Sequence, residues 1–85
     1  MFQIELGNPA QRFLNKCDNA LYERLMAKIK NLAQNPFPSD VKRVVGRAEK
    51  IFRVRVGDYR IQYVVLYKEN TLIITDVDQR SRAYD

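Results

Sequence analysis

The hydrophobic positions near the start of the chain change their spacing at Gly7. Before it, hydrophobic and polar residues alternate from Phe2 to Leu6, which predicts a strand with one buried face. After it, hydrophobic residues follow the i, i+3, i+4, i+7 spacing of an amphipathic helix, with Asn8 as the N-cap and Pro9 as the first helical residue. The residues of this stripe are Ala10, Phe13, Leu14 and Cys17. The sequence therefore predicts a strand followed directly by a short helix.

A second, longer amphipathic helix is predicted to begin after Asp18, whose carboxylate can cap the helix N-terminus. Its apolar stripe consists of Leu21, Leu25, Ile29 and Leu32, flanked by Met26 and Ala33. Asn35 and Pro36 end the pattern, because proline cannot donate a helical hydrogen bond and restricts the residue before it. We interpret this stripe as a helix face packed on the core.

From Val41 onward the chain consists of short runs rich in valine, isoleucine and tyrosine, which favour strands. The predicted strands are residues 41–45, 51–56, 59–67 and 72–77. Gly57 and Asp58 suit a two-residue type II′ turn, and residues 68–70 are expected to form a second hairpin turn. The order of elements predicts an α+β fold, in which two N-terminal helices pack on an antiparallel-rich sheet of one N-terminal and three to four C-terminal strands. We expect residues 1–85 to form a single domain.

The composition excludes several kinds of chemistry. The chain has no histidine and a single cysteine, Cys17, so the usual zinc sites and an internal disulfide are excluded. Neither a glycine-rich phosphate loop nor a dinucleotide-binding motif is present, and we expect no metal or other cofactor. No apolar run approaches the ~18 residues of a membrane span, and the first residues do not resemble a signal peptide. We therefore expect a cytoplasmic protein with no membrane partner.

The positive charge is concentrated in one segment. Residues 42–60 contain seven basic and two acidic residues, while the rest of the chain contains eight of each, so the net charge of +5 arises entirely in this segment. The basic residues of the segment are Lys42, Arg43, Arg47, Lys50, Arg53, Arg55 and Arg60. Such a concentration indicates an anionic partner, and nucleic acid or the ribosome is the expected one.

Strand alternation divides these residues between two faces. Arg53 and Arg55 lie on the face opposite Phe52 and Val54, and a two-residue turn at 57–58 pairs Arg55 with Arg60. Like charges opposite each other destabilise a sheet, and a phosphate held between two guanidinium groups removes the repulsion. The alternative interpretation is that the arginine stems cover apolar surface while their charged ends remain in water.

The final ten residues, 76–85, are predicted to form a polar tail after the last strand. The tail contains Arg80, Arg82 and Tyr84. An aromatic side chain near arginines is suited to stacking on an unpaired base, which is common in RNA recognition.

Two segments carry a resemblance to a known family. The run FRVRVGDYRIQY at residues 52–63 and the ending ITDVDQRSRAY at residues 74–84 resemble the RelE family of toxins. The resemblance covers nearly the whole chain. It implies a microbial-ribonuclease-like fold and a type II toxin that cleaves mRNA in the ribosomal A site, thereby inhibiting translation. It also implies a small RelB-like antitoxin protein as a partner.

The resemblance assigns roles to individual residues. Arg53 and Arg55 match the family's basic pair on a central strand, and Arg60 matches the arginine of the next strand. Arg80 matches a basic residue before the C-terminus, and Tyr84 the tyrosine that stacks beside the cleaved nucleotide. Wider contacts with ribosomal RNA or the antitoxin are expected from the remaining basic residues, Lys42, Arg43, Arg47, Lys50 and Arg82.

The implied reaction is attack of a ribose 2′-hydroxyl on the adjacent phosphate, which leaves a 2′,3′-cyclic phosphate and requires no metal. Arginines can stabilise the anionic transition state, but a guanidinium keeps its proton and cannot act as the base. The candidate proton acceptors are Tyr84, Lys50, Asp76, Asp78 and ribosomal RNA. This chain also departs from the family pattern, with Gln79 where many relatives have histidine and Asp78 where they often have glycine.

Two alternative functions remain open from the sequence. The related ParE toxins share the fold and poison DNA gyrase without cutting RNA. A basic module that binds the ribosome or RNA without chemistry is the third hypothesis.

Overall fold

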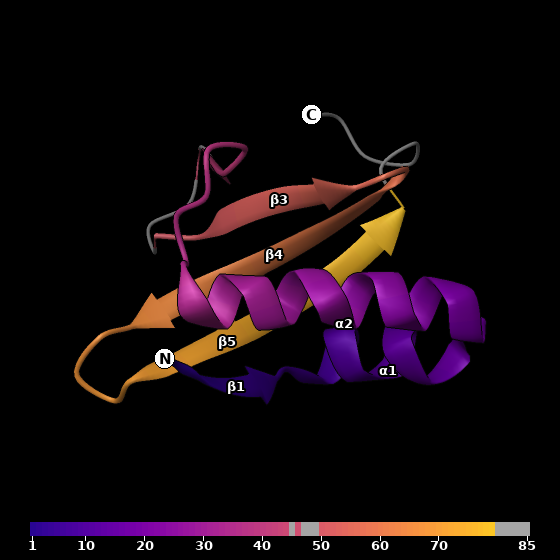
Figure 1. Ribbon diagram of the computed structural model, residues 1–85, viewed down its shortest axis with the longest axis horizontal. Helices are drawn as coiled ribbons and strands as arrows, with labels where there is room; N and C mark the ends of the chain where they lie inside the picture. Colours follow the sequence, from indigo (N-terminus) through magenta and orange to yellow (C-terminus); the bar gives the residue numbers. More distant parts are fainter. Residues whose placement is uncertain (45, 47–49, 80–85) are drawn as a thin grey trace.

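A five-stranded sheet forms the centre of the fold (Figure 1). The computed structural model describes residues 1–44, 46 and 50–79. The strands are β1 (Gln3–Leu6), β2 (Lys42–Arg43), β3 (Phe52–Val56), β4 (Tyr59–Leu66) and β5 (Thr71–Gln79). Their order across the sheet is β1-β5-β4-β3-β2, with β1 parallel to β5 and the other neighbours antiparallel. The predicted α+β fold with an antiparallel-rich sheet is confirmed.

Two helices precede the antiparallel strands, as the sequence predicts. They are α1 (Asn8–Lys16) and α2 (Asn19–Gln34), and α2 lies across one face of the sheet in Figure 1. Asp18 is the N-cap of α2, where its carboxylate accepts a hydrogen bond of 2.8 Å from the backbone N–H of Leu21. Asn35 is the C-cap, so both predicted ends of this helix are confirmed.

The predicted N-cap of α1 is wrong by one residue. Gly7 occupies the cap position, and Asn8 is already helical. The backbone N–H of Gly7 donates to the carbonyl oxygen of Ile74 at 2.8 Å, and a Cβ at Gly7 would lie 3.1 Å from that oxygen. This close approach to β5 explains why the helix begins after a residue without a side chain.

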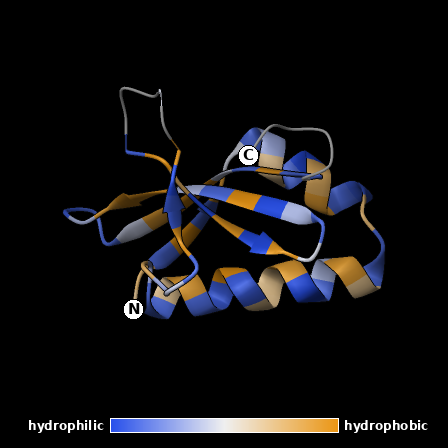
Figure 2. Cartoon of the chain, turned by 90° about the horizontal axis from the view of Figure 1, so that it is seen from above, coloured by the Kyte–Doolittle hydropathy of each residue, from blue (hydrophilic) through white to orange (hydrophobic). Residues whose placement is uncertain are grey.

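The hydrophobic core lies between the helices and the covered face of the sheet. Figure 2 shows hydrophobic and hydrophilic residues alternating along the strands and around α2. The core contains the predicted stripe residues Ala10, Leu14, Leu21, Leu25, Ile29 and Leu32, together with Val54, Ile61, Tyr63, Leu72, Ile74 and Val77. The interpretation of the α2 stripe as a core face is therefore confirmed.

Two predicted strands differ from those of the structure by more than one residue at one end. The strand expected at 41–45 is reduced to Lys42–Arg43, although the backbone N–H of Val44 still donates to the carbonyl of Ile51. The last strand extends to Gln79, so Asp76 to Gln79 belong to β5 and not to a polar tail. The extension occurs because β4 is long enough to pair with these residues through Tyr59.

Neither helix in the described part of the chain combines the length and apolar character that crossing a membrane requires.

Candidate nucleic-acid interface

The β3–β4 hairpin has the register that the sequence predicts. Val56 pairs with Tyr59, and Arg55 pairs with Arg60. Gly57 has a φ of 58°, while Asp58 does not have a positive φ, as expected for a type II′ turn with glycine at its first position. The turn therefore places Arg53, Arg55 and Arg60 on one face.

This face is the one opposite the core, and we call it the open face. It carries two rows of cross-strand neighbours from β3, β4 and β5, because paired residues point to the same side of a sheet. One row is Arg55, Arg60 and Asp78, and the other is Arg53, Gln62 and Asp76. Both rows thus run from a basic residue on β3 to an acidic residue on β5.

Arg60 forms a two-point ion pair with Asp78. Its Nε donates to Oδ1 at 3.2 Å and its Nη2 to Oδ2 at 3.1 Å. The Arg60 residue is 8% exposed, so its guanidinium is held in a nearly buried position. The sequence predicts only an external anion beside the Arg55 and Arg60 pair, whereas in the structure Asp78 already neutralises part of that charge. The contact is not predicted from the sequence, because the local pattern places Asp78 in a polar tail.

A bulge in β5 brings the acidic residues onto the open face. Gln62 pairs with Asp76 and Tyr63 with Ile74, so Thr75 is an extra residue on β5. The hydroxyl of Thr75 donates to the carbonyl of Gln62 at 3.2 Å. Because side chains alternate along a strand, this extra residue turns Val77 toward the core and Asp76 away from it.

The surroundings of Asp76 make its ionised form less favourable. Partial burial raises the pKa of the Asp76 carboxyl, and the neighbouring Asp78 carboxylate raises it further. The backbone N–H of Val77 and the positive charges of Arg60 and Arg12 act in the opposite direction. A carboxyl whose pKa is raised in this way is a candidate for proton transfer.

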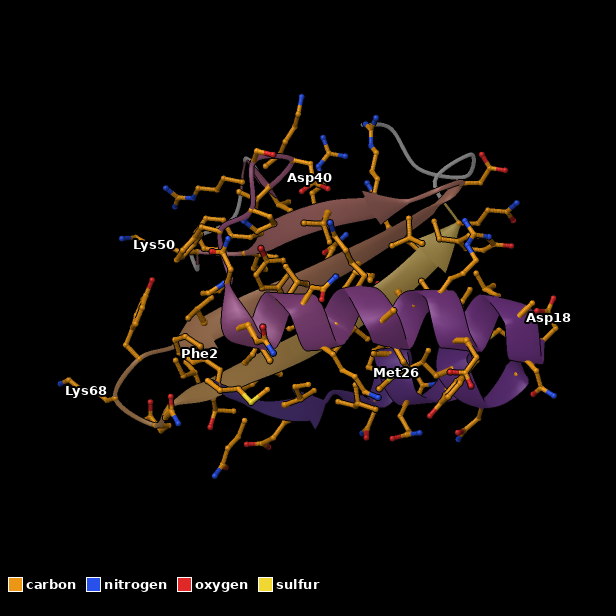
Figure 3. All side chains as sticks on the ribbon, viewed as in Figure 1. Phe2, Asp18, Met26, Asp40, Lys50 and Lys68 are labelled. Carbon is orange, nitrogen blue, oxygen red and sulfur yellow. The ribbon has the colours of Figure 1, made fainter. Side chains whose placement is uncertain are left out.

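The remaining basic residues lie at different places. Lys42 pairs with Arg53 and extends the second row, whereas Arg43 pairs with Phe52 and lies on the other face of β2. A hollow of about 210 Å³ along β3 is lined by Asp40, Lys42, Arg53, Val54 and Arg55. Figure 3 shows Asp40 beside β3 and Lys50 at the end where β3 begins. Lys42 is therefore the residue that joins the arginines on the open face.

Four predicted site residues, Arg47, Arg80, Arg82 and Tyr84, lie outside the described residues. Their roles stay predictions.

A larger hollow, of about 530 Å³, lies away from the open face. It is bounded by α1, the start of α2 and the ends of β4 and β5, and its lining includes Phe13, Cys17, Leu21 and Tyr59. Burial raises the pKa of the Cys17 thiol, and the adjacent Asp18 raises it further, so the reactive thiolate is disfavoured. The charges that suit a phosphate are on the open face, and we take that face as the candidate site. Among the described residues, no cluster of acidic or cysteine side chains could hold a metal ion.

Known proteins are similar to this chain in sequence and in fold. A protein of Methanocaldococcus jannaschii named "Putative toxin RelE1" is 31% identical over 98% of this chain and 94% of its own length. The RelE of the archaeal RelE–RelB complex from Pyrococcus horikoshii is 27% identical, with a TM-score of 0.80, and the match covers 96% of this chain and 98% of that one. The intact E. coli RelBE complex contains a chain with a TM-score of 0.81 at 16% identity, covering all of both chains, which shows the fold alone.

A family model described as the ParE toxin of the type II toxin-antitoxin system parDE matches residues 4–84. The fold and this match define the class, which is that of the toxins of type II toxin-antitoxin systems. Within this class the chain belongs to the RelE family of the RelE/ParE superfamily.

Proposed function

We propose that this toxin is a ribosome-dependent endoribonuclease that cleaves mRNA in the A site and so inhibits translation. The observation that carries the proposal is the cluster of Arg53, Arg55 and Arg60 on the open face. Guanidinium groups bind phosphate oxygens at two points and stabilise the negative charge that develops on a phosphorane. The RelE name of the relative from M. jannaschii supports the same function.

The proposed reaction is an in-line attack of the 2′-hydroxyl on the adjacent phosphorus, which gives a 2′,3′-cyclic phosphate and a free 5′-hydroxyl. Arg55 and Arg60 act on the phosphate, and Arg53 and Lys42 bind the neighbouring backbone. The proposal includes Arg80 as a further positive charge and Tyr84 as a stacking platform for the base. The chain has no histidine, and its arginines and lysines are therefore the candidate sources of this charge stabilisation.

The test is a translating extract programmed with one mRNA and analysed by primer extension. We expect new 3′ ends at A-site codons with the natural sequence, and a loss of about 10²-fold or more in cleavage rate with Arg55→Ala. Arg55 is exposed and lies on the open face, so the substitution should leave the fold intact. Lys30→Ala, an exposed lysine of α2, is the matched control that should cleave normally. Intact message during translation arrest would instead indicate a binding module without chemistry.

Inhibition of DNA gyrase is the second candidate function, because the matching family model is that of the ParE toxin. The basic open face favours RNA cleavage over this alternative. Loss of negative supercoiling in plasmid DNA after expression, with intact message, would establish the gyrase function and refute the ribonuclease.

We also propose a RelB-like antitoxin as the partner, since the P. horikoshii and E. coli relatives are named as complexes with RelB. With a net charge of +5, this toxin favours an acidic partner that covers the open face. Both the ribosome and the antitoxin place the proposed activity in the cytoplasm. Coexpression with the small protein encoded beside the gene should restore translation and yield a stable complex.

A further inference from the structure

The row of Arg53, Gln62 and Asp76 separates positive from negative charge over two strand spacings. Neighbouring strands are ~4.8 Å apart, so the backbone of β5 lies roughly 10 Å from that of β3. Arg53 and Asp76 occupy the two ends of one row, with Gln62 between them. Long arginine side chains reaching inward from β3 would hold a phosphate above β4, within the range of a carboxylate on β5.

The two aspartates of β5 are not equivalent. Both oxygens of Asp78 accept hydrogen bonds from Arg60, so this carboxylate is engaged in an ion pair. Asp76 has no ion pair within 4.0 Å among the described residues, and the bulge at Thr75 turns it onto the open face. Bulges often aim a side chain at an active site.

We propose that Asp76 is the general base that accepts the proton of the attacking 2′-hydroxyl. This inference rests on the proposed ribonuclease function. The 2′-oxygen forms a bond to phosphorus as its proton passes to the Asp76 carboxylate, and the bond from phosphorus to the 5′-oxygen breaks. The 5′-oxygen takes a proton from water, and Asp76 returns its proton to water. Asp78 positions Arg60 for the phosphate.

The charges around Asp76 suit this role. Arg60 from β4 and Arg12 from α1 attract its charge, whereas Asp78 on its own strand repels it. Gln62, its neighbour on β4, is neutral. The net effect raises its pKa above that of an ordinary aspartate, so the carboxylate is a stronger base.

The experiment measures single-turnover cleavage of mRNA bound to stalled ribosomes, with the natural protein and with Asp76→Asn. We expect Asp76→Asn to lower the cleavage rate by about 10²- to 10⁴-fold, while the affinity for the ribosome stays within threefold. The rate of the natural protein should rise tenfold per pH unit at acidic pH, and Asp76→Asn should lose this dependence. Glu69→Gln makes the same chemical change in the exposed turn between β4 and β5 and should cleave normally.

A substrate with sulfur in place of the 5′-oxygen distinguishes a general base, which takes the 2′-hydroxyl proton, from a general acid, which protonates the leaving group. The sulfur leaves as a thiolate and needs no proton. If Asp76 is the base, the defect of Asp76→Asn persists on this substrate, and a rescued rate would overturn the assignment. A rate within threefold of the natural protein on the ordinary substrate would also overturn it. Asp76→Glu retains a carboxylate and should recover part of the rate, and circular dichroism checks that each variant is folded. If the natural protein itself cleaves no message, the ribonuclease proposal fails first.

Discussion

The ion pair between Arg60 and Asp78 should contribute measurably to stability, although it lies on the face opposite the core. The Arg60 side chain is 10% exposed and that of Asp78 is 37% exposed, with a separation of 3.1 Å. Removing one partner of a fully buried pair costs about 3–5 kcal/mol, whereas an exposed pair contributes about 0.2–1 kcal/mol. This pair is intermediate, so Asp78→Ala should lower the free energy of unfolding by about 2 kcal/mol.

The loss can be measured by urea and thermal unfolding followed by circular dichroism. For a chain of 85 residues, a loss of about 2 kcal/mol corresponds to a decrease in Tm of roughly 8–16 °C. Glu23→Ala, on the exposed surface of α2, is the control and should change stability by less than ~0.5 kcal/mol. A double variant with Arg60→Met should recover at least half of the loss, because it removes both charges of this ion pair from their partly buried place.

Two results would refute this reasoning. One is a loss below ~0.5 kcal/mol for Asp78→Ala, which would mean that water or other groups satisfy Arg60 fully. The other is strict additivity of the two substitutions, which would mean that the contact has no energetic coupling.

Three further predictions concern the fold and the proposed base. The hydroxyl of the fully buried Tyr63 donates a hydrogen bond of 2.6 Å to the carbonyl of Pro36. Tyr63→Phe should therefore lower the free energy of unfolding, measured in urea, by about 1–2 kcal/mol. An unchanged midpoint would contradict a contribution of this hydrogen bond to stability. Asp18→Ala removes the cap of α2 and should cost about 1 kcal/mol, with Asp18→Asn retaining most of it. Because the pKa of Asp76 is raised on folding, ionising it costs stability at neutral pH and nothing at a pH below its ordinary value of ~3.9. Asp76→Asn should therefore raise the urea midpoint at pH 7 and leave it unchanged near pH 3, and a decrease at pH 7 would contradict the cause given for the shift.

The sequence predicts those parts of the site that depend on local rules. The glycine of the β3–β4 turn fixes the pairing of Arg55 with Arg60, because a two-residue turn allows one register only. The capping aspartate and the apolar stripe of α2 are local in the same sense, and both are confirmed.

The rest of the site depends on distant pairing and was not predictable from the sequence. A single extra residue at Thr75 exchanges the two faces of β5, and nothing in the local pattern marks a threonine as a bulge. Without the bulge, Val77 would point away from the core and the two aspartates toward it. The ion pair of Arg60 follows from this shift, so the sequence predicts the arginines but not the carboxylate that binds one of them.

The open face is costly for the fold, and this cost is itself an argument for function. Two arginines lie opposite each other, and the carboxyl of Asp76 has a raised pKa beside a second carboxylate. A sheet selected for stability alone would place small polar or oppositely charged pairs at these positions. Packing of the helices on the covered face of the sheet stabilises the fold enough to offset this cost. Functional sites are commonly less stable than the rest of a protein in this way. The arrangement is also directional, with positive charge on β3 and the candidate base on β5. If the phosphate binds as proposed, the strand order places the arginines that stabilise its charge on one side and the carboxylate that accepts the 2′-hydroxyl proton on the other.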